Sequence, residues 1–419
     1  MDEGLLDALL SPYGLASAVT GPGPLPPGRL LTGCVADVGT PHPRGAAPAA
    51  LSGGGRGHDA PGRARFLALA EAAERYAMAV GPAGHRTVRA SARELGGDCL
   101  EPFRYPRCSA RELAADDCPL TAFDPAAPVR WVAGHDLAGG GDVLLPAAMA
   151  FRYPEPEGGA ERFTWPSSTG HAVHTDPAEA VLRGALEVVE RDAVALLWLQ
   201  RMALPPVPAA VLDARTVRLG DDCARRFVAV RLLDATTDLG VPTVCCLLTA
   251  PHHPRLRHWF AAAAERTLTE AAAKALEEAV GLTALLGAPE VAAPHTAVTS
   301  NARHLGAPQR AGAFGFLTGR AAAPRVAHTP LPPGRRALTE LTARLVRAGA
   351  RPVAVDLTTA ELADAGLTAV RVVVPDLQPL SPHPRARFAA HPRLYRAPAL
   401  LGRTVLPEEE LNPWPAPYA

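Results

Sequence analysis

Three long segments of the chain carry apolar residues at helical spacing. Each has Ala, Leu or Val on most of its surface, which is typical of helices packed inside a protein. The second has a well-marked start, because Asp176 can cap it, Pro177 fits the first helical position and Glu179 follows three residues after the cap. The third should begin near Thr267 and end near Gly287. The segments are "RFLALAEAAERYAMAV" (65–80), the run through "LEVVERDAVALLWL" (186–199), and "RTLTEAAAKALEEAVGLTALLG" (266–287).

Short β-branched runs between these helices predict strands. They are "VRWVAGHDL" (129–137), "VLLPAAMAF" (143–151), "RRFVAVRLLDA" (225–235), "GVPTVCCLLTA" (240–250), "RPVAVDL" (351–357) and "AVRVVVPDL" (369–377). A short helix is expected near 338–348. Because helices and strands are interspersed without a strict βαβ series, we expect an α+β fold. The Pro- and Gly-rich stretch 21–58 is predicted to be irregular, "PHHPRLRH" (251–258) a surface loop, and the proline-rich tail 406–419 extended.

Composition and charge narrow the functional classes. The chain has 419 residues, of which 48% are apolar, with 42 basic and 42 acidic residues and no formal net charge. This balance gives no support for a nucleic-acid or membrane-surface partner. The N-terminus lacks a signal-peptide pattern and no apolar run is long enough to span a bilayer, so we expect a cytoplasmic protein. Seven cysteines without any CxxC pair argue against a disulfide framework and a structural zinc site.

Each of the three predicted helices carries two closely spaced acids. An exposed like-charge pair costs only about 0.2–0.5 kcal/mol, so any single pair could be a solvated helix face. Burial of an unpaired carboxylate costs far more and requires a counterion or a metal. These helices are largely apolar and hold few basic residues, which favours a shared site for Mg²⁺, a cation that prefers oxygen ligands. The pairs are Glu71 and Glu74, Glu187 and Glu190, and Glu277 and Glu278.

Magnesium commonly accompanies a phosphate-bearing substrate, but the usual nucleotide motifs are excluded. Lys274 is the only lysine and follows Ala273, so there is no GxxxxGK[ST] loop, and no kinase motif set is present. "SGGGRG" (52–57) could cradle phosphates with its backbone N–H groups or could be a flexible loop. Lys274 could pair with Glu270 or Glu278, or contact a phosphate. The residues therefore indicate phosphoryl transfer by positioning and charge neutralisation.

Several of these segments together resemble the YcaO family. The ATP-binding helices of that family are similar to "ALAEAAERYA" (68–77), "SSTGHAVHTDPAEAVLRGALEVVERDA" (167–193) and "AAAKALEEAV" (271–280). The later segments "NARHLGAPQRAGAFGFL" (301–317) and "AVDLTTAELADAGLTAVRVVVPDLQPL" (354–380) extend the resemblance. "PWPAP" (413–417) resembles the PxPxP tail of the azoline-forming branch. The resemblance covers nearly the whole chain from about Leu51 onward.

The resemblance implies a YcaO-type fold, with mixed sheets and packed helices around a nucleotide site. Residues 51–419 would form the cyclodehydratase domain, and residues 1–50 an irregular or short-helix segment packed on it. The implied activity is ATP-dependent cyclodehydration in peptide natural-product biosynthesis. A Cys, Ser or Thr side chain of a ribosomal precursor peptide adds to the preceding carbonyl, the oxyanion takes the γ-phosphate of ATP, and loss of phosphate leaves a thiazoline or oxazoline.

The resemblance also assigns roles to residues. Mg²⁺ and nucleotide would be held by Glu71, Glu74, Glu187, Glu190 and Glu278. Further nucleotide contacts would come from Arg56, Ser168, Arg191 and Lys274. The tail would organise the active site through Pro413, Pro415, Pro417 and Ala419. Departures from the family pattern stand at Arg56, Leu67, Thr175, Lys274 and Gly281.

Partners and alternatives follow from the same resemblance. We expect a separate leader-peptide-binding or ThiF-like protein to deliver the precursor, because the segment before Leu51 is too short for such a domain. A flavin-dependent azoline dehydrogenase is a further expected partner, and the chain is expected to form a homodimer. Two alternatives remain open: YcaO-type thioamide or amidine formation, and a non-catalytic scaffold in a synthetase complex, which the departures at Leu67 and Gly281 favour.

Overall fold

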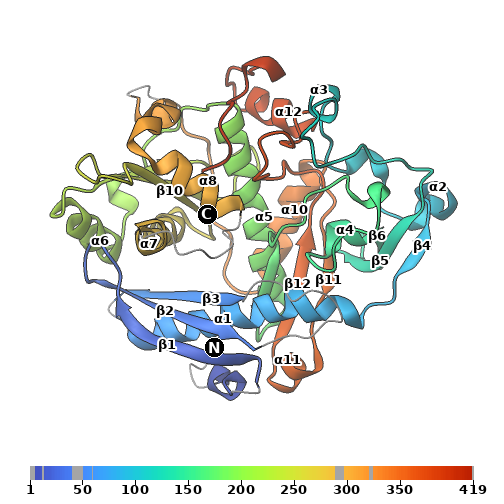
Figure 1. Cartoon of the computed structure of the whole chain (residues 1–419), viewed down its shortest axis with the longest axis horizontal. Helices are drawn as coiled ribbons and strands as arrows, with labels where there is room; N and C mark the ends of the chain where they lie inside the picture. Colours follow the sequence, from blue (N-terminus) through green and yellow to red (C-terminus); the bar gives the residue numbers. More distant parts are fainter. Residues whose placement is uncertain are drawn as a thin grey trace.

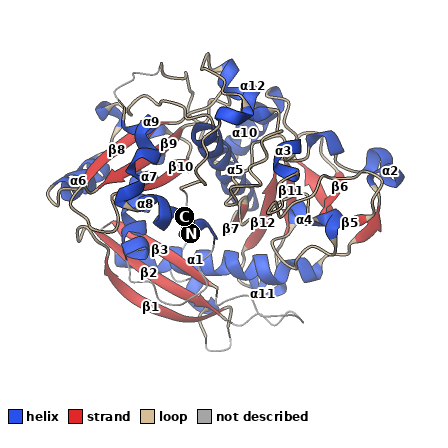
Figure 2. Cartoon of the chain, turned by 45° about the horizontal axis from the view of Figure 1, so that its top comes forward, coloured by secondary structure: helices blue, strands red, loops and turns tan. Residues whose placement is uncertain are grey.

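In the part of the chain that the structure describes, the strands form three separate sheets with helices packed between them (Figures 1 and 2). The structure is a computed structural model that describes residues 5–11, 14–39, 51–58, 60–287, 297–319 and 324–417. Every sheet carries antiparallel pairs, and the helices are interspersed among the strands along the chain. The α+β prediction is therefore confirmed.

The first sheet is antiparallel and lies at the N-terminal end. It contains β1 (Ala16–Pro24), β2 (Leu31–Val38) and β3 (Ser52–His58) in the order β1-β2-β3. Helix α1 (Pro61–Val80) packs directly on it. The predicted irregular structure in 21–58 is therefore wrong, because much of that stretch is strand. The division predicted at residue 50 falls between β2 and β3, which pair in one sheet.

The strand β3 escaped prediction because its inward residues have no side chains. A Cβ on Gly53 would lie 2.3 Å from the Ala72 nitrogen, and one on Gly55 would lie 1.8 Å from the Ala64 carbonyl oxygen. Alternate glycines thus let the backbone of α1 lie against the strand, while no apolar alternation marks it in the sequence. The loop alternative for "SGGGRG" is excluded, since all six residues belong to β3.

The second sheet has three antiparallel strands in the order β10-β9-β8. They are β8 (Ala229–Asp234), β9 (Thr243–Thr249) and β10 (His258–Ala264), and they are covered by α7 (Leu268–Gly287). Strand β10 follows the predicted surface loop and was missed, because its alanine run has low intrinsic strand preference. Its seven residues are all buried between α7 and the helices behind, so tertiary packing overrides that preference.

The third sheet has six strands. They are β4 (Val88–Ala90), β5 (Val129–Asp136), β6 (Asp142–Pro146), β7 (His171–His174), β11 (Val353–Asp356) and β12 (Thr368–Val373), in the order β4-β5-β11-β12-β7 with β6 on β5. The strand predicted for 143–151 is correct only as far as Pro146. Residues Ala147–Ala150 form the short helix α4.

Helix α5 (Pro177–Leu199) lies near the middle of the molecule, between the second and third sheets (Figure 1). It contacts β7, β10 and β12, as well as α10 (Arg336–Arg347). Asp176 caps it as predicted, accepting a hydrogen bond of 2.9 Å from the Ala178 N–H. Burial on several sides explains why its sequence is apolar almost all round.

Shorter helices complete the fold. The α-helices are α2 (Ala92–Leu95), α3 (Ala110–Leu113), α6 (Ala214–Ala224), α8 (Ala297–Gly306), α9 (Gly315–Thr318), α11 (Ala360–Asp364) and α12 (Arg393–Leu400). The 3₁₀ turns are η1 (Leu5–Leu9), η2 (Gly81–Gly84), η3 (Gly96–Asp98), η4 (Pro102–Arg104), η5 (Gly159–Glu161), η6 (Ala209–Val211), η7 (Pro308–Phe314) and η8 (Glu408–Glu410). The predicted extended tail is interrupted by η8 at Glu408–Glu410. From 411 to 417 it is non-helical, as predicted.

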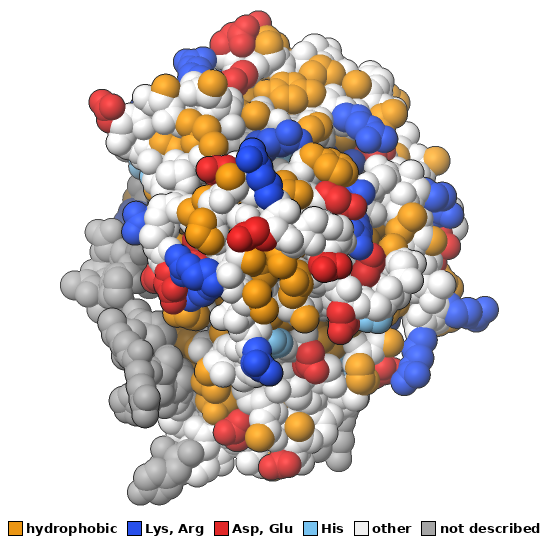
Figure 3. Space-filling view, turned by 90° about the vertical axis from the view of Figure 1, so that its right-hand side faces the viewer, with side chains coloured by type: hydrophobic (Ala, Val, Ile, Leu, Met, Phe, Trp, Pro, Cys, Tyr) orange, Lys and Arg blue, Asp and Glu red, His pale blue; other side chains and the backbone are white. Residues whose placement is uncertain are grey.

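The surface is mixed in character. On the face in Figure 3, acidic, basic and apolar side chains are interspersed, in keeping with the zero formal net charge. Among the helices of the described residues, none is long and apolar enough to cross a membrane. The cysteines of the chain are free thiols, and Cys245 and Cys246 are buried in β9.

Candidate functional site

The first acidic pair lies on α1, next to the glycine strand. Arg75 donates to Glu71 at 2.8 Å and to Glu74 at 3.1 Å. The other oxygen of Glu71 accepts the Gly54 N–H at 3.0 Å. The pair is therefore held in place by its own helix and by β3, with one guanidinium bridging both carboxylates.

The second pair, on α5, is held in the same way. Arg191 donates to Glu187 at 2.9 Å and also pairs with Glu190. Glu187 accepts the Gly170 N–H at 2.9 Å, and Glu190 accepts the Ala264 N–H at 3.2 Å from the end of β10. Gly170 has a φ of +87°, and a Cβ there would lie 2.1 Å from the Val372 carbonyl oxygen, so only glycine fits this close approach to β12.

On α7, the only lysine of the chain has a partner that the sequence did not indicate. Lys274 pairs with Glu265 at 3.0 Å, at the end of β10. Glu270 instead joins Thr267 in a reciprocal cap, with the Glu270 N–H donating to the Thr267 hydroxyl at 3.1 Å. Burial opposes the charge of Lys274, but Glu265, Glu278 and Glu190 together raise its pKa. Lys274 thus lies among acids from three elements.

Electrostatic interactions connect the three helices. Burial raises the pKa of Glu74 to about 8, and the carboxylates of Glu187 and Glu71 add to the rise against the opposing charge of Arg75. Burial likewise raises the pKa of Glu278 to about 7, with Glu190 adding to the rise against Lys274. The predicted acids of α1, α5 and α7 are therefore close enough to act on one another. We call these acids, together with Glu265 after β10, the acidic site, comprising Glu71, Glu74, Glu187, Glu190, Glu265 and Glu278.

Glu277 does not share this surrounding. Burial raises its pKa, and the charges that oppose the rise come from Arg215, Arg56 and Arg63. Of the two adjacent acids on α7, Glu278 is therefore the one that faces α5. Glu278 as a ligand of Mg²⁺ stays a prediction.

Two of the departures from the family pattern explain each other. A Cβ on Gly281 would lie 2.0 Å from Nε of Arg56, so the arginine side chain crosses α7 where residue 281 has no side chain. From there its charge acts on both Glu277 and Glu278. Arg56 and Gly281 are therefore a coupled pair beside the acidic site. Leu67, by contrast, packs against the apolar core of α1 and the first sheet.

Arg371 on β12 is a further cation that the sequence reasoning missed. It donates to the Ser167 carbonyl oxygen, and it lines a cavity together with Arg191. Burial lowers its pKa to about 10, and the charge of Glu187 opposes this change. The sequence could have indicated this residue, because Arg371 is the only charged residue in the apolar run "AVRVVVP". A buried cation needs a partner, so such an arginine is a candidate site residue. The adjacent Ser168 binds His171 through its carbonyl oxygen at 2.8 Å.

The residues of the acidic site fit Mg²⁺ and a nucleotide by their chemistry. The carboxylates lie among the cations Arg56, Arg75, Arg191 and Lys274, and burial is the main cause of the raised pKa values of Glu74 and Glu278, with neighbouring carboxylates adding to the rise. Carboxylate oxygens are the ligands that Mg²⁺ prefers, and nearby guanidinium groups suit phosphates. In the part of the chain that the structure describes, no three acidic, histidine or cysteine side chains converge on one point, because the carboxylates hold arginines.

The proline tail is fixed to the last turn of α5. The Asn412 N–H donates to the Leu199 carbonyl oxygen at 2.9 Å, and the Trp198 indole N–H donates to the Trp414 carbonyl oxygen at 2.9 Å. Pro415 lines a small cavity with Pro379 and Leu380, which also line the cavity that contains Arg191. The tail therefore runs along α5 toward the acidic site, with Pro417 buried. Ala419 lies outside the described residues.

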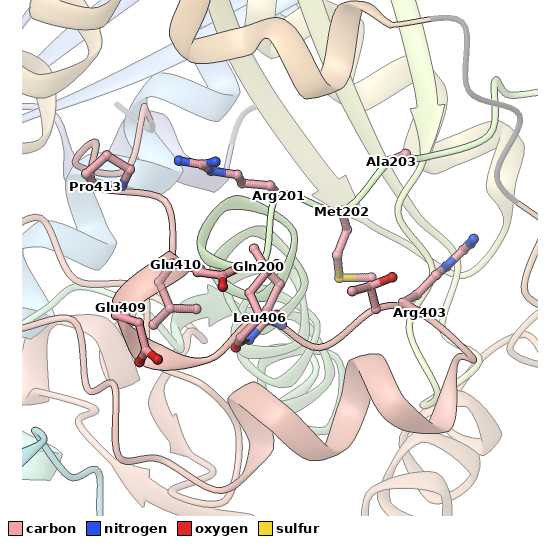
Figure 4. A pocket seen from close by; sticks show the side chains of 11 residues that line it. Gln200, Arg201, Met202, Ala203, Arg403, Leu406, Glu409, Glu410 and Pro413 are labelled. Atoms are coloured by element: carbon pink, nitrogen blue, oxygen red, sulfur yellow. Dashed lines mark hydrogen bonds between the residues drawn. The ribbon is translucent and has the colours of Figure 1, made fainter.

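A larger cavity of about 550 Å³ lies at the C-terminal end of α5. Arg201, Glu409 and Pro413 line it, and Figure 4 shows Arg201 extending toward Pro413. The helix end is eight residues beyond Arg191, or about 12 Å along the axis. This cavity is thus separate from the acidic site, although Pro413 was expected to organise that site.

Comparison with known proteins supports a single family. A family model described as YcaO cyclodehydratase, ATP- and Mg²⁺-binding, matches residues 54–378. An uncharacterised protein in the tfuA 3′ region of Rhizobium leguminosarum bv. trifolii is 34% identical over 128 residues, 29% of each chain. An uncharacterised protein of Methanothermobacter thermautotrophicus is 28% identical over 187 residues, 44% of this chain and 45% of that protein. The chain thus matches less than half the length of these curated relatives.

Solved structures share the fold. A heterocyclase in complex with substrate and cofactor has a TM-score of 0.83 at 23% identity, covering 99% of this chain and 56% of that one. The heterocyclase TruD has a TM-score of 0.67 at 24% identity, covering 85% and 51%. YcaO from Methanopyrus kandleri, bound with AMPPCP and Mg²⁺, has a TM-score of 0.59 at 22% identity, covering 87% and 86%. Because the family model spans α1, α5 and α7 and more than half of the chain, the chain belongs to the YcaO cyclodehydratase family.

Proposed function

We propose that this protein is an ATP-dependent cyclodehydratase that forms thiazolines or oxazolines in a ribosomal precursor peptide. The observation that carries the proposal is the acidic site, where carboxylates from three helices lie close enough that their repulsion adds to the burial that raises the pKa of Glu74 and Glu278. Carboxylates that repel one another in a partly buried site favour a divalent cation. The fold similarity to two heterocyclases supports the azoline-forming branch over thioamide or amidine formation.

The proposal gives the site residues distinct roles. Glu71, Glu74, Glu187, Glu190 and Glu278 would hold Mg²⁺ and the nucleotide, and when bound these would supply the transferable γ-phosphoryl group. Further nucleotide contacts would come from Arg56, Ser168, Arg191 and Lys274. The two arginines 191 and 371 share a cavity wall, where they can stabilise the oxyanion that forms when a thiol or hydroxyl adds to the peptide carbonyl. Glu265 would position Lys274 through their 3.0 Å ion pair.

The tail and the partners belong to the same proposal. Pro413, Pro415 and Pro417 would organise the active site through the attachment of the tail to α5. One structural relative is the microcin synthetase McbBCD complex with bound pro-MccB17, which shares 13% identity at a TM-score of 0.60. We propose by analogy that this chain acts with partner proteins on a precursor peptide, and that a flavin-dependent dehydrogenase acts on the azoline afterwards.

The test is a reaction of the protein with its precursor, partner and Mg-ATP, followed by peptide mass and phosphate release. Loss of one water per ring with matched phosphate release is expected. A different ATP-dependent mass change would instead indicate thioamide or amidine chemistry. No turnover with retained partner binding would indicate a scaffold, and both outcomes would contradict the proposal.

The first prediction concerns Glu187, which contacts both Arg191 and the Gly170 N–H. Glu187→Gln should lower turnover by about 100-fold or more, because a charge that supports the metal and transition state is removed. The melting temperature should change little, since the amide can still accept the Gly170 hydrogen bond. The control is Glu157→Gln at a surface carboxylate that is 58% exposed. Unchanged turnover in Glu187→Gln would contradict the site assignment.

A further inference from the structure

Two of the seven cysteines differ from the rest in their access to solvent. Cys108 and Cys118 are partly exposed, whereas the other five are buried. The buried five are Cys34, Cys99, Cys223, Cys245 and Cys246. A soluble oxidant can therefore reach only Cys108 and Cys118 in the folded chain.

The accessible pair brackets the short helix α3. Cys108 directly precedes Ser109, which caps α3. Cys118 lies in the turn after α3, where its N–H donates to the Ala115 carbonyl oxygen at 3.0 Å. A side-chain hydrogen bond joins the thiols of Cys108 and Cys118, and both side chains pack on the buried cluster that contains Phe388. Two thiols ten residues apart in the chain are thus in contact, as disulfide formation requires.

The same cluster adjoins the cavity that contains Arg191 and Arg371. Phe388 belongs to the cluster, and together with Gln378 it lines this cavity of about 90 Å³. Its φ of +58° lies in the left-handed region, which an aromatic residue adopts only where its surroundings hold it. The thiol pair therefore packs on a cluster that forms part of the cavity wall.

Hydrogen bonds to α3 hold the backbone on either side of Phe388. The Arg387 N–H donates to Glu112 at 2.6 Å, and the Ala389 N–H donates to the other oxygen of the same carboxylate at 2.8 Å. Glu112 is 5% exposed and lies in α3, between the two cysteines in the chain. A constraint on α3 therefore acts on the segment 387–389.

We propose that Cys108 and Cys118 form a redox modification site, in which a small disulfide such as oxidised glutathione closes a reversible bond between the two thiols. The bond ties the two ends of α3 together and stiffens the segment 387–389 at the cavity wall. Whether it is open or closed depends on the reduction potential of the surroundings. Because the reaction uses neither ATP nor a precursor peptide, this inference stands apart from the proposed function.

The two thiols have different parts in the reaction. Burial raises the pKa of Cys108 to about 12, and the charge of Glu112 adds to the rise, so this thiol stays protonated near neutral pH. The Cys118 thiolate therefore attacks first, binding one glutathione sulfur and releasing the other glutathione as a thiolate. The Cys108 sulfur then attacks Cys118, loses its proton to solvent and releases the second glutathione. The two cysteines are oxidised by two electrons, and the glutathione disulfide is reduced to two thiols.

The test is incubation of the reduced full chain with oxidised glutathione, followed by alkylation and tryptic mass mapping. Trypsin cleaves after Arg107, Arg111 and Arg130, so the bond would link the peptides 108–111 and 112–130. The linked product should weigh two hydrogen atoms less than the two peptides together, and dithiothreitol should separate them. Two outcomes would overturn the site: a chain that carries glutathione without the link, or a folded chain that stays reduced while the urea-unfolded chain reacts.

Single-cysteine variants separate the two steps. Cys108→Ser should retain one glutathione on Cys118, because no second thiol is present to release it. Cys118→Ser should react at least about tenfold more slowly, because the remaining Cys108 thiol is mostly protonated. Equal rates in the two variants would contradict this order of attack. Cys99 and Cys223 are internal controls and should remain thiols in every sample, since they are 2% and 1% exposed.

Amide hydrogen exchange tests the effect on the cavity wall. The N–H groups of Arg387 and Ala389 should exchange about tenfold more slowly in the oxidised chain than in the reduced chain. The Gly54 N–H is the matched control and should not change, because it donates to a glutamate of the first sheet's helix, Glu71, at 3.0 Å. Equal exchange of Arg387 and Ala389 in the two forms would show that the bond does not constrain this wall.

Discussion

At the scale of single residues, the missing side chain of Gly281 leaves space for a neighbouring residue. Arg56 occupies the space beside Gly281, where a Cβ would come within 2.0 Å of its Nε. Gly281 alone would look like the loss of a polar group, whereas Arg56 keeps a cation where the family often has lysine. Together they place a guanidinium near Glu278 in the acidic site. The pair therefore weakens the argument for a non-catalytic scaffold that Gly281 alone had favoured.

We predict that Gly281→Ala weakens Mg-ATP binding by about tenfold, because the new methyl group displaces Arg56. In an Arg56→Ala background the same substitution should have little effect, since nothing is left to displace. Binding is measured by titration calorimetry. Gly220→Ala on α6 is the control, because a Cβ at that position would meet no atom within 4 Å. Additive effects of Gly281→Ala and Arg56→Ala would show that the two residues are independent.

Two buried histidines predict a loss of stability in acid. Burial lowers the pKa of His258 to about 4, and it lowers that of His391 to about 4 although the Pro375 carbonyl opposes it. An unfolded histidine takes up its proton near pH 6.5. The free energy of unfolding should therefore be fully present above pH 6.5 and fall as the pH drops toward 4, by about 2.5 kcal/mol per histidine at pH 4.5.

Urea unfolding between pH 7 and 4.5 measures this effect. His391→Asn should reduce the pH dependence by the contribution of one histidine, since the asparagine does not titrate while His258 still does. His135→Asn should leave it unchanged, because the side chain of His135 is 58% exposed. The interpretation is wrong if His391→Asn unfolds with the same pH dependence as the wild-type protein.

At the scale of secondary structure, contact between α1 and β3 depends on the glycines that face the helix. Gly53, Gly55 and Gly57 approach the backbone at α1. Gly54 points the other way, and a Cβ added to it would lie 3.9 Å from the Glu71 carboxylate. The same strand presents the Gly54 N–H to Glu71. Packing and site geometry are therefore set by one short strand.

Gly55→Ala should lower the free energy of unfolding by about 2–3 kcal/mol or more, because its methyl group would overlap the Ala64 carbonyl. Gly54→Ala, one residue earlier in the same strand, should stay within about 0.5 kcal/mol of the wild-type protein. Denaturant unfolding distinguishes the two variants. Equal effects would show that α1 does not pack on the Gly55 face.

At the scale of the whole molecule, a buried charge cluster joins α5 to the C-terminal part of the chain. Arg393 on α12 donates to both oxygens of Asp192 at 2.7 Å and pairs with Asp238 at 2.9 Å. Asp192 also accepts the Gln378 N–H from the cavity wall. Because Asp192 directly follows Arg191, this cluster links the position of α5 in the fold to the geometry of the active site.

Removal of one partner should leave a buried charge without compensation. Asp192→Ala is expected to lower the free energy of unfolding by about 3–5 kcal/mol. The exposed pair of Asp117 and Arg385 provides the control, and Asp117→Ala should cost at most about 1 kcal/mol. Chemical denaturation measures both. Similar values for the two variants would mean that Asp192 is not a structural anchor.

The sequence by itself determined the three long helices, their acids and the family, because helix periodicity, the Asp176–Pro177 start and closely spaced glutamates are local patterns. The sequence did not determine which distant segments contact one another. The glycine strand β3, the alanine-rich β10, and the pairing of Lys274 with Glu265 all depend on backbones that approach only after folding. The same holds for Arg371 and the cavity it shares with Arg191. The tertiary structure decided these features, since burial and close approach are properties of the packed chain.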